Sequence, residues 1–203
     1  MLQIRCKNNN TVKNVPVGSS LLEIYDSFGI ESPYRPISAK VNNASQGLKF
    51  RLYQNRDIEY LDITSPSGMR VYIRSLCFVL YKSVKDVFPE SKLYIEHPIS
   101  RGYYCNIVKP GITRRSRGIT EEEIKKVYTR MCEIVSSNIP FHRKEVPTEE
   151  AISIFREQGF LDKVKLLETS GKIYTDYYIL DDTVDYYYGP LVPSTGYLEV
   201  FGL

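Results

Sequence analysis

The sequence has no tryptophan, only two histidines and no C-x-x-C pair among its 203 residues. Zinc sites in proteins are built from closely spaced cysteines and histidines, so the sequence predicts no metal site. The four cysteines are scattered along the chain: Cys6, Cys77, Cys105 and Cys132. Isolated cysteines of this kind predict reduced, mostly buried thiols and a cytoplasmic protein.

Long apolar runs are also missing. No stretch approaches the roughly 20 residues that a transmembrane helix needs, and the N-terminal sequence MLQIRCKNNN lacks the apolar segment of a signal peptide. We therefore predict no membrane partner. A phosphate-binding G-x-x-x-x-G-K-[ST] motif is absent as well, so no cofactor is expected in this chain. The formal net charge of +3 neither requires nor excludes a nucleic-acid partner.

Tyrosine, in contrast, is abundant. The chain has 17 tyrosines, 42% hydrophobic residues and 25% charged residues. The last two values are typical of a globular protein with a packed core. Tyrosine combines an apolar ring with a polar tip, so this number favours half-exposed sheet surfaces and, secondarily, a stacking platform for bases.

The first 61 residues predict a small mixed domain. Residues 2–6 and 11–15 alternate between apolar and polar and flank an Asn-rich turn, which indicates a β-hairpin. Ser20 and Glu23 form a capping box that starts a helix, and Gly29 ends it. Three further strands are predicted at residues 38–41, 47–53 and 57–61. This order of elements is that of a β-grasp, ubiquitin-like domain.

The remainder of the chain mixes long helices with strands. An apolar stripe with helical spacing covers residues 69–88, and Pro89 ends that helix. Strands are predicted at residues 92–96 and 102–108, and capping signals start helices at Thr120 and near Pro147. A strand-rich tail covers residues 172–203 and includes a strand at 197–201. The whole chain therefore predicts an α+β fold.

The tail contains a shaped loop, VDYYYGPLVPSTG, from Val184 to Gly196. With this loop and three shorter pieces, the chain resembles a known pair of domains. Those pieces are Phe88-Pro89, Gly102-Tyr103-Tyr104, and the helix start from Glu149 to Phe155. Residues 1–63 resemble a TGS domain. Residues 68–203 resemble the second additional domain, which edits mischarged tRNA in threonyl-tRNA synthetases.

The resemblance also implies which catalytic groups are missing. In the synthetases the long helix carries H-x-x-x-H, and the loop looks like D-x-C-x-G-P-H-V-P. The matching positions here are Arg74 and Phe78 on the helix, and Tyr187 and Leu191 in the loop. Arginine stays protonated, phenylalanine and leucine offer no lone pair, and tyrosine titrates near 10. We therefore predict no catalytic residue and interpret the loop as a former active site.

Two interpretations of this former site stay open. In the first, the four residues simply fill the cleft as part of the core. In the second, the cleft is a remodelled pocket in which Arg74 anchors an anion and Tyr187 forms a hydrogen-bonding wall. Arg74 would then reach solvent, or pair with a carboxylate such as Asp185 or with a bound anion.

A TGS domain followed by a histidine-less editing-like domain also resembles the N-terminal part of bacterial uridine kinase-like proteins. The run from Gly68 to Leu76 fits that group best. This resemblance implies a non-catalytic, ligand-binding or regulatory module. Its partner would be a C-terminal kinase domain of the same polypeptide, and that kinase would use ATP and Mg²⁺ for nucleoside phosphorylation. The ligand of the module would be a nucleotide or an RNA.

The main alternative is a tRNA-binding or tRNA-editing domain. An editing enzyme would need substitute residues such as Tyr187 and His97, whereas His97 before Pro98 is more typical of a structural histidine. Arg114, Arg115 and Arg117 form a basic loop, which is either solvated or in contact with an anion or RNA phosphates. The Asp181-Asp182 pair favours a hairpin turn over a cation site.

Overall fold

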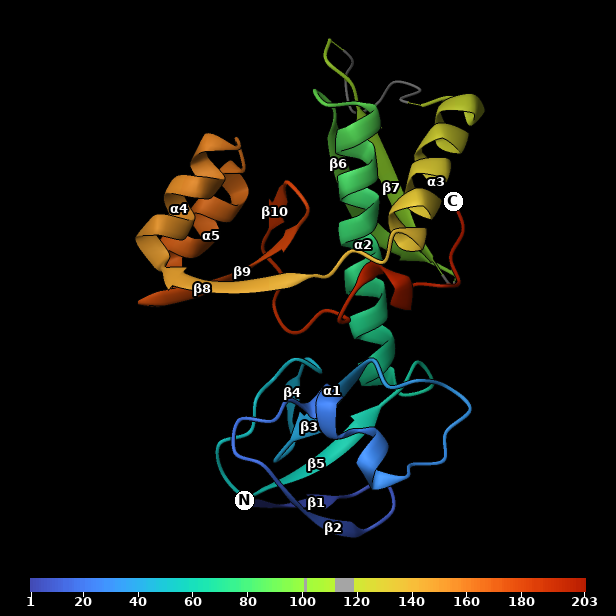
Figure 1. Ribbon diagram of the computed structural model, residues 1–203. Coiled ribbons are helices and arrows are strands. Elements are labelled where there is room, and N and C mark those ends of the chain that lie inside the picture. The colour runs from blue at the N-terminus through green and yellow to red at the C-terminus, as the bar shows by residue number, and fades with distance from the viewer. Residues whose placement is uncertain (101, 112–118) are drawn as a thin grey trace. The chain divides into compact units, whose positions relative to one another are not determined.

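The computed structural model describes residues 1–100, 102–111 and 119–203 (Figure 1). Its chain forms two compact units. The first unit comprises residues 1–139 and 189–203, and the second comprises residues 140–188. The α+β fold class is confirmed, because both units combine helices with sheets. The predicted domain boundary between residues 63 and 68 stays a prediction.

The first unit begins with a five-stranded mixed sheet. Its strands are β1 (Leu2–Cys6), β2 (Thr11–Val15), β3 (Ser38–Val41), β4 (Ala44–Gln46) and β5 (Arg56–Leu61). They lie in the order β2-β1-β5-β3-β4, with β1 and β2 antiparallel and β1 parallel to β5. The hairpin, the following helix and the crossover to a parallel central strand are the β-grasp arrangement that the sequence predicts.

Alternation along the strands explains how this sheet packs. Leu2, Ile4 and Cys6 point to one face and are buried, whereas Gln3 and Arg5 are exposed. The buried face packs on helix α1 (Leu21–Ile24), which starts at the predicted capping box of Ser20 and Glu23. A short 3-10 helix, η1 (Asp26–Phe28), follows, and Gly29 ends it with a φ of 60°.

The long helix α2 (Pro66–Val87) is the centre of the rest of the first unit. The Ser65 side chain caps its N-terminus by accepting a hydrogen bond from Gly68 N, at 3.0 Å. Helix α3 (Glu121–Ser136) packs against α2 and starts at the predicted capping box of Thr120 and Glu123. The antiparallel ribbon of β6 (Lys92–Ile99) and β7 (Gly102–Val108) follows α2 in the chain.

Two strand predictions in this unit are wrong. Residues 47–53 are turns and coil with one isolated bridge, Ser20–Arg51, while the neighbouring strand β4 was not predicted. Of residues 197–201, Tyr197 ends the 3-10 helix η2 (Thr195–Tyr197) and residues 198–201 are coil. In both segments the backbone is held by hydrogen bonds to loops and helix ends, such as Leu52 N to Ser19 O at 2.9 Å, and not by a strand ladder.

The second unit is a three-stranded antiparallel sheet with two helices. Its strands are β8 (His142–Pro147), β9 (Tyr174–Leu180) and β10 (Thr183–Asp185), in the order β10-β9-β8. The helices are α4 (Thr148–Glu157) and α5 (Leu161–Thr169). Val146, Phe155, Leu167 and Tyr177 are buried together as its core. Helix α4 is confirmed as predicted, whereas β8 and α5 are elements that the sequence pattern does not predict.

The four cysteines are free thiols. Cys6 is buried and the other three are half-buried, so the prediction of mostly buried thiols holds fully only for Cys6. Across the described residues, none of the helices is long and apolar enough to cross a membrane. Within the same residues, no three His, Cys, Asp or Glu side chains come together as ligands for a metal ion.

The Cys77 thiol on α2 predicts a pH dependence of stability. Burial, reinforced by the nearby Cys105, raises its pKa from about 9 to about 11. The unfolded chain therefore loses this proton first, so the thiol's contribution to stability falls as the pH rises from about 9 to about 11. Two pKa units correspond to about 2–3 kcal/mol. In urea unfolding between pH 9 and pH 11, the free energy of unfolding should fall less steeply with pH for Cys77→Ala than for the wild type. Equal slopes of this free energy against pH would contradict the effect of burial on the thiol.

Candidate functional site

The positions that match the editing motif are divided between the two units. Arg74 and Phe78 lie on α2, and Leu191 lies in the closing segment of the first unit, residues 189–203. Phe78 and Leu191 are buried, with exposed fractions of 0% and 4%. Tyr187 belongs to the second unit and is half-buried. The predicted clustering of Tyr187 with the other three positions stays a prediction.

A buried serine holds the closing segment against α2. The Ser75 hydroxyl donates to Val71 O within the helix, at 2.8 Å, and accepts a hydrogen bond from Val192 N, at 3.0 Å. Ser75 is fully buried, so these two bonds satisfy the hydroxyl and the backbone amide away from water. The result is a fixed register between the helix and the Pro-Leu-Val sequence of the loop.

Arg74, one residue before Ser75, reaches the same segment. Its Nη1 atom donates to Pro190 O at 2.6 Å. Gly189 makes room for this contact, because a Cβ atom there would lie 2.9 Å from Arg74 Nη1. The glycine also has a φ of 105°, a conformation that other residues rarely adopt. Arg74 is therefore a fixed positive charge at the loop, able to attract an anion but not to accept a proton.

Thr195 holds the closing segment three residues after Val192. This residue is fully buried, and its hydroxyl donates to Ile134 O at 2.7 Å while accepting from Ile139 N at 2.9 Å. Its backbone amide donates to Ile139 O at 2.8 Å. Ser75 and Thr195 thus fix the loop at Val192 and at Thr195, and the resemblance implies that the reactive side chains of this loop have been replaced.

In the second unit the same loop sequence begins with a buried ion pair. Lys163 Nζ on α5 contacts Asp185 Oδ1 at the end of β10, and the two side chains are 20% and 8% exposed. The Tyr186 backbone amide also donates to Asp185 Oδ1, at 2.6 Å. Asp185, which the sequence analysis offers as one partner for Arg74, therefore has a lysine partner within its own unit.

The environment of Lys163 is aromatic. Its Nζ atom lies 4.2 Å from the centre of the Phe160 ring and 5.9 Å from that of Phe155. Burial lowers the pKa of Lys163 to about 8, and the nearby Asp162 opposes this change. An amine with such a pKa exchanges protons near neutral pH. Its contact with Asp185 also connects α5 to the start of the closing loop.

Lys163 is not predictable from the sequence as a site residue, because it lies in α5, a helix without a recognisable start signal. The pair joins residues 22 positions apart, so no local spacing marks it. The one signal in the sequence is Asp185 itself, an acidic residue that lies between Val184 and a run of three tyrosines and ends the short strand β10. A carboxylate that is buried there requires a hydrogen-bonded or charged partner.

Three further predicted sites lie away from the closing segment in sequence or outside the described residues. Arg114, Arg115 and Arg117 lie outside the described residues. His97 is exposed in β6 and lies against the Tyr104 ring, with 5.5 Å between ring centres. Asp181 and Asp182 form the turn between β9 and β10, and Asp181 has a φ of 55°. This confirms the hairpin turn that the sequence predicts.

The chain is similar to threonine–tRNA ligases over nearly its whole length. It is 30% identical to the enzyme of Desulforamulus reducens over 202 residues, or 98% of the chain and 30% of that relative. It is 29% identical to the enzyme of Symbiobacterium thermophilum over 199 residues, or 96% of the chain and 29% of the relative. The enzyme of Syntrophotalea carbinolica is 28% identical over 204 residues, covering 100% of the chain and 31% of the relative.

No protein-family model matches the chain. The chain spans about 30% of the length of the curated relatives it matches. Its similarity to threonine–tRNA ligases supports the tRNA-related alternative more than the uridine kinase prediction, which receives no support from these relatives.

Proposed function

We propose that this chain is a tRNA-binding module that no longer hydrolyses the aminoacyl ester. The single observation that supports it best is the similarity to threonine–tRNA ligases across 93–100% of the chain. Similarity on this scale includes both the β-grasp sheet and the closing segment.

The chemistry of the loop supports binding over catalysis. Arg74 supplies a permanent positive charge, held by Pro190 O, which suits a phosphate or another anion. Phe78 and Leu191 are buried apolar side chains at positions where the resemblance implies histidines. Neither can position a water molecule or accept a proton. The scaffold of the site is therefore retained, while the groups for ester hydrolysis are replaced.

The predicted RNA contacts of Arg114, Arg115 and Arg117 belong to the same proposal. Each phosphate contact made by an arginine adds to the salt dependence of binding, because counterions are released. A nucleotide ligand, or a C-terminal kinase domain with ATP and Mg²⁺, stays a prediction without support from the relatives described above. No observation in the described residues favours it over tRNA.

A binding titration tests the proposal. We expect fluorescently labelled threonine tRNA to bind the 203-residue chain more tightly than an unrelated RNA hairpin of the same length. Changing Arg114, Arg115 and Arg117 to alanine should reduce the slope of log affinity against log salt by about 2–3. The matched control changes three exposed basic residues of the β-grasp hairpin, Arg5, Lys7 and Lys13, to alanine. Equal affinity for both RNAs would refute the proposal.

A further inference from the structure

The first unit contains a cavity that is separate from the contacts of the closing segment with Arg74 and Ser75. Its volume is about 710 Å³, and its lining comes from α2, α3, the start of β7, the loop at residues 33–37 and the last residues of the chain. Small-molecule sites in proteins have volumes of about 300–1,000 Å³. The cavity is therefore large enough for a molecule the size of a cofactor or metabolite.

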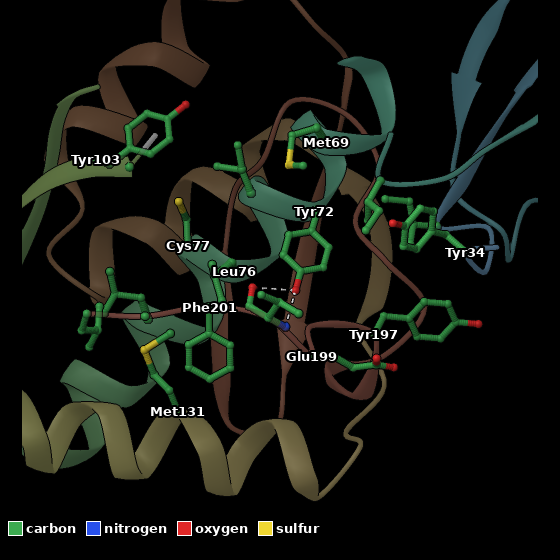
Figure 2. Close-up of a pocket in the computed structure, with 18 of the residues that line it drawn as sticks. Tyr34, Met69, Tyr72, Leu76, Cys77, Tyr103, Met131, Tyr197, Glu199 and Phe201 are labelled. Atoms are coloured by element: carbon green, nitrogen blue, oxygen red, sulfur yellow. Dashed lines mark hydrogen bonds between the residues drawn. The ribbon is translucent and has the colours of Figure 1, made fainter. Parts of the chain in front are cut away.

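The interior of the cavity is apolar, aromatic and rich in sulfur (Figure 2). Leu76 and Cys77 of α2 line it, as do Met69 at one end and Met131 of α3 at the other. The Phe201 ring, from the end of the chain, also lines it. Thioethers adapt their shape and make favourable contacts with aromatic rings. These side chains therefore suit a flat ring system more than a branched or strongly hydrated molecule.

A hydrogen-bonded tyrosine fixes one wall. The Tyr72 hydroxyl donates to Val200 O and accepts from Val200 N, each at 2.9 Å. This pair of bonds holds the segment that carries Phe201 against α2, as the dashed lines in Figure 2 show. Because the hydroxyl is used in this way, the Tyr72 ring presents its apolar surface to the cavity.

Charge is confined to one part of the lining. Among the described lining side chains, the charged ones are Arg35 and Glu199. They pair with each other at 2.8 Å and are 44% and 70% exposed. Burial raises the pKa values of Cys77 and Cys105, so both thiols are neutral at pH 7. A charged group in the interior would lose its hydration without gaining a partner, which is costly.

We propose that this cavity is a binding site for an uncharged, flat aromatic small molecule. The rings of Tyr72 and Phe201 and the thioethers of Met69 and Met131 contact the faces of its ring system. Polar substituents of the ligand lie toward Arg35 and Glu199, where water and both signs of charge are available. This site is distinct from the contacts that Arg74 and Ser75 make with Pro190 and Val192.

A fluorescent probe tests the proposal with the 203-residue chain. The neutral 1-aminoanthracene should bind saturably and fluoresce more strongly when bound. The anionic 1-anilinonaphthalene-8-sulfonate should bind at least about tenfold more weakly, a difference of about 1.4 kcal/mol. Two variants that fill the cavity, Leu76→Phe and Cys77→Met, should each weaken aminoanthracene binding about tenfold or more.

The control variant is Leu22→Phe, which adds the same side chain at an exposed position of α1 and should bind like the wild type. Circular dichroism and thermal unfolding identify any variant that fails to fold. If one of the two filled variants does not fold, the affinity of the other for aminoanthracene tests the proposal. The proposal is overturned if the neutral probe does not saturate, if the folded filled variants bind it unchanged, or if the anionic probe binds more tightly.

Discussion

Replacing Phe78 with alanine is expected to lower the free energy of unfolding by about 3–5 kcal/mol. Phe78 lies on α2 and is 0% exposed, so the change leaves a cavity the size of a phenyl ring in the core of the first unit. The change of Phe78 to histidine should also destabilise the protein, because it places a polar ring where the native side chain is apolar. Restoring the residue type that the resemblance implies would thus not restore a site.

Urea unfolding followed by circular dichroism measures both effects. Tyr53→Ala is the control, since it removes an aromatic ring that is 66% exposed and should change the free energy by less than about 0.5 kcal/mol. A loss below about 1 kcal/mol for Phe78→Ala would mean that this position is not part of the packed core.

The second large effect is expected at the Lys163–Asp185 ion pair. Removing one partner, as in Lys163→Met or Asp185→Leu, leaves the other charge buried and should cost about 3–5 kcal/mol. Replacing both at once should cost much less than the sum, since no unpaired charge remains. A double-mutant cycle from urea unfolding measures this coupling.

The same unit provides a matched control for the ion pair. Arg156 on α4 and Glu168 on α5 form another ion pair, at 2.8 Å, but their side chains are 56% and 48% exposed. Arg156→Ala should therefore cost about 0–1 kcal/mol. Equal effects at the exposed and buried pairs would contradict the account of Asp185 as a buried charge that depends on Lys163.

The elements that could be predicted from sequence are those with local signals. The capping boxes at Ser20 and Thr120 start helices as predicted, because the side-chain acceptor and the N3 glutamate act within one turn. The alternation of residues 2–6 sets the buried face of β1. Gly29 ends its helix because it adopts a positive φ that other residues avoid.

The elements that were missed lack such signals. The N-cap of helix α5 is Phe160, which offers no side-chain cap, so the N-terminus of this helix looks like loop sequence. Strand β8 is exposed except at Val146, so it shows no apolar alternation, and its pairing with β9 is set by tertiary contacts. The apolar and aromatic residues of 197–201 suggested a strand, but Tyr72 binds this backbone at Val200 instead.

The candidate site was predictable only in part. A motif comparison locates Arg74, Phe78, Tyr187 and Leu191, since each lies at a fixed place in a short pattern. Lys163 has no such pattern, and its role appears only when α5 brings it to Asp185. The serine and threonine that fix the loop, Ser75 and Thr195, were likewise missed, because short hydroxyl side chains carry no sequence signal of burial.

The central claim is that a scaffold related to threonine–tRNA ligases binds tRNA without hydrolysing its ester. The most direct measurement is the release of serine from threonine tRNA esterified with serine, at chain concentrations at which the tRNA is bound. We predict release at the spontaneous rate, whatever the chain concentration, because Phe78 and Leu191 offer no proton acceptor. Release that rises in proportion to the concentration of the chain would contradict the claim.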